Sequence, residues 1–158
     1  MNRIMTAIFA GFGATVAIGI LSLLDSTLKE TIMLMAPFGA TAVLVFGLPD
    51  SPLAQPKNVI LGHLVTAIIG VAFVQLIGVT PITLAIATGL GVSAMLITKT
   101  THPPAGANPL LIMLSGQSWG FLVTPVLLGA IIIVLMGRAM QKGHKVWSFR
   151  NTAVQLNK

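Results

Sequence analysis

The chain of 158 residues has no cysteine and no tyrosine, and only 8% of its residues are charged. The absence of cysteine excludes disulfides and thiolate metal sites. The three acidic residues, Asp25, Glu30 and Asp50, all lie at the edges of apolar runs, so no carboxylate is left inside them to coordinate a cation. A soluble domain carries roughly 25% charged residues. The scarcity of charge therefore excludes an ordinary soluble fold.

Apolar residues make up 55% of the chain, and they predict an all-α integral membrane protein. Residues 4–24 and 59–79 are each 21 residues without a charge, which as helices span about 31 Å and are long enough to cross a bilayer. The first is too long for a signal peptide. We expect about four full transmembrane helices at residues 4–24, 59–79, 82–98 and 121–137, and two weaker pieces at 31–48 and 109–114.

Two breaks rich in proline and glycine interrupt this pattern, near residues 37–41 and 102–108. Backbone cannot lie unpaired in hydrocarbon, so such breaks must be buried in protein or line a cavity. Transporters often bind substrate there, at the N-termini of short helices. Thr41 and Asn108 are suitable N-caps for short helices at 42–48 and 109–114. We expect the two breaks to be non-helical and to face each other near the midplane.

The two breaks also resemble each other at an offset of 67 residues. Residues 37–44 align with residues 104–111, and one Pro, one Gly, one Ala and one Leu are identical. Each copy would hold three elements, so the copies, residues 4–79 and 82–137, would lie inverted in the membrane. Chance is the alternative explanation, because small and apolar residues are common in this chain.

The net charge of +6 is concentrated in a basic tail, residues 138–158, which follows a single transmembrane domain, residues 1–137. If every apolar piece crosses, Arg3, Lys57, Lys99 and the tail share one side. The positive-inside rule then predicts that both termini are cytoplasmic. A re-entrant piece would change this topology. We expect the tail to lie on anionic lipid and not to bind nucleic acid.

Four motifs in a fixed order carry a family resemblance. They are residues 36–44 (APFGATAVL), 51–60 (SPLAQPKNVI), Gly62-His63 and 101–107 (THPPAGA). With these motifs the chain resembles the HPP family of integral membrane proteins, named for the motif found here at 102–104. The resemblance covers roughly residues 8–137. It implies a small-anion transporter, because family members of bacteria and plastids are associated with nitrite. Asn108-Pro109 departs from the family pattern, and we expect no control by nucleotides, because these residues lack the appended regulatory domain of some longer relatives.

Groups near the breaks are positive or rich in N–H donors, which suits a small anion. Each has a plainer explanation as well: a histidine can lock a loop, a lysine can follow the positive-inside rule, and Thr41 or Asn108 can be only a cap. The candidate substrate-binding residues are Pro37, Gly39, Thr41, Lys57, Asn58, His63, Lys99, His102, Pro104, Gly106 and Asn108.

The sequence shows no paired carboxylates, nucleophile–base pair, phosphate loop or metal cluster, so we expect neither an enzyme nor a cofactor. We expect a transporter of a small inorganic anion, nitrite above all, in a bacterial inner membrane. A channel and a non-transporting structural subunit are the alternatives. Six short elements enclose little volume, so a homo-oligomer is expected.

Overall fold

A computed structural model describes residues 3–28 and 32–156, with side chains up to residue 143. Lys29, Glu30 and the side chains of most of the basic tail therefore lie outside the described residues. Throughout the described part the chain is helical, without strands. The α-helices are α1 (Arg3–Thr27), α2 (Pro37–Ala42), α3 (Pro56–Leu76), α4 (Pro81–Ile97), α5 (Asn108–Ser115) and α6 (Leu128–Leu156). Short 3-10 or π turns are η1 (Val43–Gly47), η2 (Pro52–Ala54), η3 (Pro103–Ala107), η4 (Trp119–Leu122) and η5 (Val123–Leu127).

This all-helical architecture confirms the predicted fold class. Three helical stretches are long and apolar enough to cross a membrane: Arg3–Thr27, Pro56–Leu76 and Trp119–Gly143. The fourth predicted span is the shorter helix α4, whose 17 residues extend about 25 Å. Thr80 and Thr83 close its N-terminus by bonding each other's backbone N–H groups, and Pro81 stands at the first helical position.

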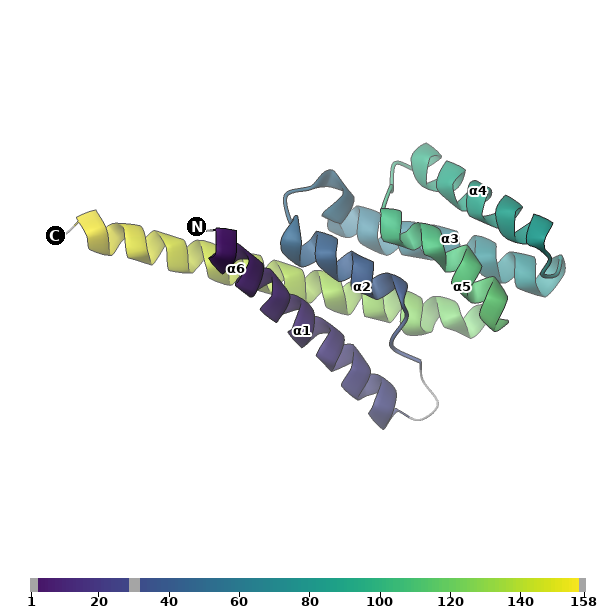
Figure 1. The fold of residues 1–158 in the computed structure, drawn as a ribbon, viewed down its shortest axis with the longest axis horizontal. Coiled ribbons are helices and arrows are strands. Elements are labelled where there is room, and N and C mark those ends of the chain that lie inside the picture. Colours follow the sequence, from purple (N-terminus) through teal and green to yellow (C-terminus); the bar gives the residue numbers. More distant parts are fainter. Residues whose placement is uncertain (1–2, 29–31, 157–158) are drawn as a thin grey trace.

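The helices alternate in direction along the chain (Figure 1). Helices α1, α3 and α5 run one way, and α2, α4 and α6 run the opposite way. The start of α1, the start of α3, the end of α4 and the C-terminal part of α6 therefore lie at the same end of the bundle. Arg3, Lys57, Lys99 and the basic tail belong to these segments, so we call this the basic end of the molecule.

The expected break at residues 37–41 is wrong, because helix α2 already begins at Pro37. Proline has no N–H to lose at a first helical position, so the Ala-Pro step starts the helix instead of ending it. Together with η1, the helix runs from Pro37 to Gly47. The extended stretch lies earlier, around residues 32–36, where Met33 and Met35 are buried and their neighbours are exposed.

The second break is nearer to the prediction. His102 is extended (φ −138°, ψ 99°), and residues 103–107 form a 3-10 turn before α5 starts at Asn108. Helix α2 packs against this turn, so the two breaks do lie beside each other within one chain.

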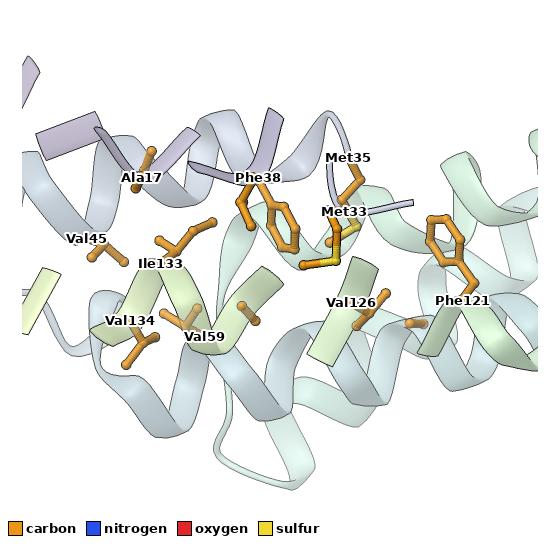
Figure 2. Packing of buried hydrophobic residues seen from close by; sticks show 14 of the residues in the cluster. Ala17, Met33, Met35, Phe38, Val45, Val59, Phe121, Val126, Ile133 and Val134 are labelled. Carbon is orange, nitrogen blue, oxygen red and sulfur yellow. The ribbon is translucent and has the colours of Figure 1, made fainter. Parts of the chain in front are cut away.

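The main apolar core lies between α1, α2, α3 and α6. Phe38 is fully buried there, with Met33 and Met35 beside it and Ile133 and Val126 nearby (Figure 2). Two glycines of α6 allow these side chains to approach the helix backbone. A Cβ at Gly129 would overlap the Phe38 ring, and a Cβ at Gly137 would overlap Val45.

The same offset of 67 residues relates close contacts in the two parts of the bundle. Gly62 of α3 lies against the Thr100 carbonyl oxygen, and Gly129 of α6 lies against the Met33 carbonyl oxygen. Gly70 of α3 likewise meets Ile112, and Gly137 of α6 meets Val45. In each comparison the two glycines are 67 positions apart, and so are the two residues that they contact.

Candidate functional site

Four polar side chains from different elements meet inside the bundle. They are Thr41 of α2, His63 of α3, His102 before η3 and Asn108 of α5, and each is fully buried. We call them the polar cluster. The Thr41 hydroxyl oxygen lies 2.8 Å from Nε2 of His63 and 3.0 Å from Nε2 of His102. The two imidazole centroids are 5.0 Å apart. A polar group at such depth in a membrane protein is a functional candidate by default.

The Nδ1 atoms of the two histidines have polar partners as well. Nδ1 of His102 lies 2.7 Å from the Leu53 carbonyl oxygen, and Nδ1 of His63 lies 3.1 Å from the Asn108 side-chain nitrogen. The edge of the Phe38 ring packs against His63 with the rings nearly perpendicular and their centroids 5.4 Å apart. Both imidazoles are thus fixed in orientation by four polar contacts, with Thr41, the Leu53 carbonyl and Asn108, and by the Phe38 ring.

The side chain of Asn108 has a donor side and an unused acceptor. Its nitrogen donates to the His63 carbonyl oxygen at 3.0 Å and to the Thr66 hydroxyl at 3.0 Å. The carbonyl contact decides the orientation of the amide, because a carbonyl oxygen only accepts. The other amide atom, Oδ1, is buried and has no hydrogen-bond partner among the described residues. Leaving such an acceptor unpaired costs about 1–3 kcal/mol.

The predicted capping roles are wrong for both polar residues. Thr41 lies within α2, and its hydroxyl bonds the Pro37 carbonyl one turn earlier as well as the two histidines. Helix α5 has no side-chain cap, and the amide of Asn108 points to α3 instead. The side chains of Thr41 and Asn108 contact the buried imidazoles instead of capping a helix. At that depth water cannot supply the hydrogen bonds that an imidazole needs.

Close packing holds the extended stretch against α3. A Cβ at Gly62 would lie 2.7 Å from the Thr100 carbonyl oxygen and 2.9 Å from Cβ of His102. Asn58, one turn earlier in α3, donates from its side chain to the Thr101 carbonyl oxygen at 2.9 Å. Asn58 is thus a positioning residue for the stretch that carries His102.

The remaining candidates fall outside the polar cluster. Pro37 and Pro104 are buried and border it, whereas Gly39 is exposed and Gly106 is half-buried. Lys57 and Lys99 are exposed at the basic end, and Lys99 adopts a positive φ of 54°. Neither lysine contributes its charge directly to the buried groups.

Sequence reasoning missed three partners of the cluster: Thr66, Phe38 and the carbonyl group of Leu53. Thr66 lies three positions after His63 and so on the same helix face, which is the signal that could have pointed to it. Its hydroxyl bonds the Gly62 carbonyl at 2.9 Å and is free to accept from Asn108. No pattern in the sequence indicates the Leu53 carbonyl, because main-chain groups are the same at every position.

A shallow groove adjoins the cluster between α2 and the η3–α5 segment. It has a volume of about 430 Å³ and is apolar, lined by Ala36, Pro37, Ala40, Pro103, Pro104, Ala107, Leu110 and Leu111. Pro37 and Pro104 line it, and the Pro37 carbonyl oxygen contacts Thr41 of the polar cluster. The groove marks the line along which the two short helical segments meet.

Residues 1–148 match the family described as "HPP, transmembrane region". The chain belongs to the HPP family. Two transmembrane proteins of Dictyostelium discoideum are similar to this HPP protein. One is 44% identical over 115 residues, covering 68% of this chain and 37% of its own length. The other is 39% identical over 111 residues, covering 65% and 39%. The chain thus spans about two fifths of the length of these relatives, and no solved structure matches it.

Proposed function

We propose that this HPP protein transports a small inorganic anion, with nitrite as the substrate that the family resemblance favours. The observation that carries the proposal is the polar cluster, which combines two imidazoles, a hydroxyl and a carboxamide inside an apolar bundle. Nitrite is a bent anion whose oxygens accept hydrogen bonds, and all four side chains of the cluster can donate one.

The charges of the described residues favour an anion over a cation. The buried polar residues are Thr41, His63, Thr66, Thr100, His102 and Asn108, and none of them is a carboxylate. Carriers for cations usually place carboxylates within the membrane. Arg3, Lys57, Lys99 and Arg138 lie in segments of the basic end, where positive potential raises the local concentration of anions.

Binding in this proposal needs a movement between α2 and η3. All ring nitrogens of the cluster have partners, so an anion gains donors only when Thr41 separates from a histidine. The apolar groove follows the line between these segments, and Pro37 both lines the groove and holds its carbonyl oxygen 3.2 Å from the Thr41 hydroxyl as a second possible acceptor. Opening along this line would expose the donors, as expected for alternating access around a fixed site.

The cellular setting belongs to the same proposal. The protein crosses a bacterial inner membrane several times, with both termini in the cytoplasm and the basic tail on anionic lipid. Copies of the chain associate in the membrane as a homo-oligomer. Reporter fusions at the two termini should give the same cytoplasmic signal, and an external N-terminus would contradict this topology.

Uptake into liposomes tests the transport proposal. Purified protein is reconstituted, and uptake of nitrite, nitrate, formate and chloride is compared with protein-free vesicles. We expect saturable nitrite uptake. Asn108→Asp places a negative charge beside His63, so it should abolish this uptake, whereas Gln75→Glu adds the same charge at an exposed position and should leave it unchanged. Equal uptake by Asn108→Asp and the parent, or no uptake of any anion by the parent, would overturn the proposal.

A further inference from the structure

The hydrogen bonds of the polar cluster run in a single direction. The Leu53 carbonyl oxygen only accepts, so Nδ1 of His102 carries a proton and donates to it at 2.7 Å. In a neutral His102 the other nitrogen then accepts, and the Thr41 hydroxyl is its donor. Thr41 has no second proton, so it accepts from Nε2–H of His63. Nδ1 of His63 faces the Asn108 amide nitrogen, which only donates, so Nδ1 carries no proton.

Two members of this hydrogen-bonded series, Thr41 in its middle and Asn108 at one end, hold an alternative partner for the reversed direction. The Thr41 proton has a second acceptor, the Pro37 carbonyl oxygen at 3.2 Å, which is free to take it if His102 becomes protonated. At the other end, the buried Oδ1 of Asn108 has no partner among the described residues. A rotation of the amide would offer this oxygen to a protonated Nδ1 of His63. An unpaired buried acceptor beside a histidine is thus explained by a second protonation state.

We propose that Asn108, His63, Thr41 and His102 form a proton relay that carries one proton with each transported anion. The inference rests on the proposed function, and it names the coupling ion. Histidine can serve in such relays because its imidazole can accept a proton at one ring nitrogen and give one up from the other. The relay fills the role that a membrane carboxylate has in other proton-coupled carriers.

The proton step balances without a further reactant. Hydronium, or the weak acid of the substrate, gives a proton to Nδ1 of His63, and the Nε2 proton of His63 passes to the Thr41 oxygen. The Thr41 proton passes to Nε2 of His102, and the Nδ1 proton of His102 leaves to water at the basic end. One proton enters and one leaves, and both imidazoles finish as the opposite neutral tautomer. The starting tautomers return while the bundle is open, when exchange with water removes one proton from each ring and places one on its other nitrogen. The Thr41 hydroxyl and the Asn108 amide then turn back to their starting orientations.

The surroundings of the two histidines keep the proton on this path. Among the described residues packed around them from α2, α3, α4, α5, η2 and η3, the buried polar set holds no other titratable group. The lysines of these segments, Lys57 and Lys99, are exposed. Next to Leu53, Ala54 lines a polar cavity of about 130 Å³ together with Gln55, Arg138 and Gln141. This cavity is the exit for the proton at the basic end.

The test measures proton and anion movement in the same liposomes. Protein is reconstituted with an internal pH dye, and nitrite uptake is started at alkaline pH, where passage of the free acid through lipid is slowest. Protein-free vesicles supply the background. We expect the parent to take up one proton per nitrite. Thr41→Val keeps the shape but removes the hydroxyl, so its remaining uptake should carry no proton. Thr41→Ser should restore the ratio.

Thr88→Val is the matched control, because the Thr88 hydroxyl bonds only the Leu84 carbonyl in its own helix. This variant should behave as the parent. A parent that takes up nitrite without protons overturns the relay and leaves the transport proposal standing. An unchanged proton ratio in Thr41→Val also overturns it. A parent that takes up no anion overturns both proposals together.

Discussion

The buried faces of α3 and α6 share a framework but differ in chemistry. At an offset of 67, Gly62 and Gly70 of α3 correspond to Gly129 and Gly137 of α6, and all four glycines admit a neighbouring segment. Between them, α3 carries His63 and Thr66, where α6 carries Ala130 and Ile133. All four of these side chains are fully buried. The close packing is thus common to both faces, and the hydrogen-bonding chemistry belongs to one.

The extended stretches that lie against these faces differ in the same way. Met33 and Met35 precede α2, and at the same offset Thr100 and His102 precede α5. All four are buried. The methionines fill apolar space against α6 (Figure 2), whereas His102 bonds Thr41 and the Leu53 carbonyl. We infer that one face provides stability and the other provides the site, a division that substitutions can test.

The largest effect is expected when α3 is given the chemistry of α6. His63→Ala with Thr66→Ile removes two partners of Asn108 and the donor of Thr41. If each lost hydrogen bond weakens binding by about 1.5 kcal/mol, nitrite uptake should fall roughly a hundredfold or more. Ile133→Val on α6 is the control and should cost only about 0.5–1.5 kcal/mol of stability. Similar uptake by the double variant and the control would remove the distinction between the two faces.

The next largest effect is expected from substitutions at corresponding positions of the two stretches, His102 and Met35. His102→Ala removes the donor of the Leu53 carbonyl and one of the three partners of Thr41, which keeps His63 and the Pro37 carbonyl, and uptake should fall about tenfold to a hundredfold. Met35→Leu is a volume-conserving change at the corresponding position and should cost under about 1.5 kcal/mol. Thermal unfolding in detergent measures stability separately from uptake. Equal losses of uptake in both variants would show that His102 acts only through packing.

A smaller effect is expected from the glycine that brings His102 to α3. In Gly62→Ala the new methyl group meets a backbone oxygen at 2.7 Å, and the strain should cost about 1–3 kcal/mol. His102 would shift, so uptake should fall by about tenfold even in the folded fraction. Gly89→Ala adds the same methyl group in open space on α4. If Gly62→Ala and Gly89→Ala have the same unfolding temperature and the same nitrite uptake, the close approach at Gly62 does not matter for the site.

Much of the fold could be predicted because long apolar runs have few alternatives in a membrane. The predicted limits of α1, α3 and α4 differ from those observed by one to three residues. The start of α2 was mistaken because Pro37 was interpreted as part of a break. Proline either interrupts a helix or begins one, and only the packing of the preceding stretch decides between them.

The site could be predicted only in part. Thr41, His63, His102 and Asn108 were all candidates, since polar residues beside breaks in apolar runs are costly to bury without partners. Their mutual contacts could not be predicted, because 22 to 61 positions separate Thr41 from its histidine partners. An Asn or Thr near a helix start has the same local sequence whether it caps that helix or bonds a neighbouring one. The difference lies in the tertiary contact.

The smallest effect is expected at the basic end. A substitution there tests whether its positive charge attracts the anion from a distance instead of binding it. Lys57 is exposed and belongs to no bond of the polar cluster, so Lys57→Gln should lower the uptake rate only about two- to threefold. The reduction should vanish at high salt, because the screening length falls from about 10 Å at 0.1 M to about 3 Å at 1 M. Lys57→Arg keeps the charge and should match the parent at every salt concentration. A loss that persists at high salt would place Lys57 among the residues that hold the anion, and the site would then extend beyond the buried face of α3.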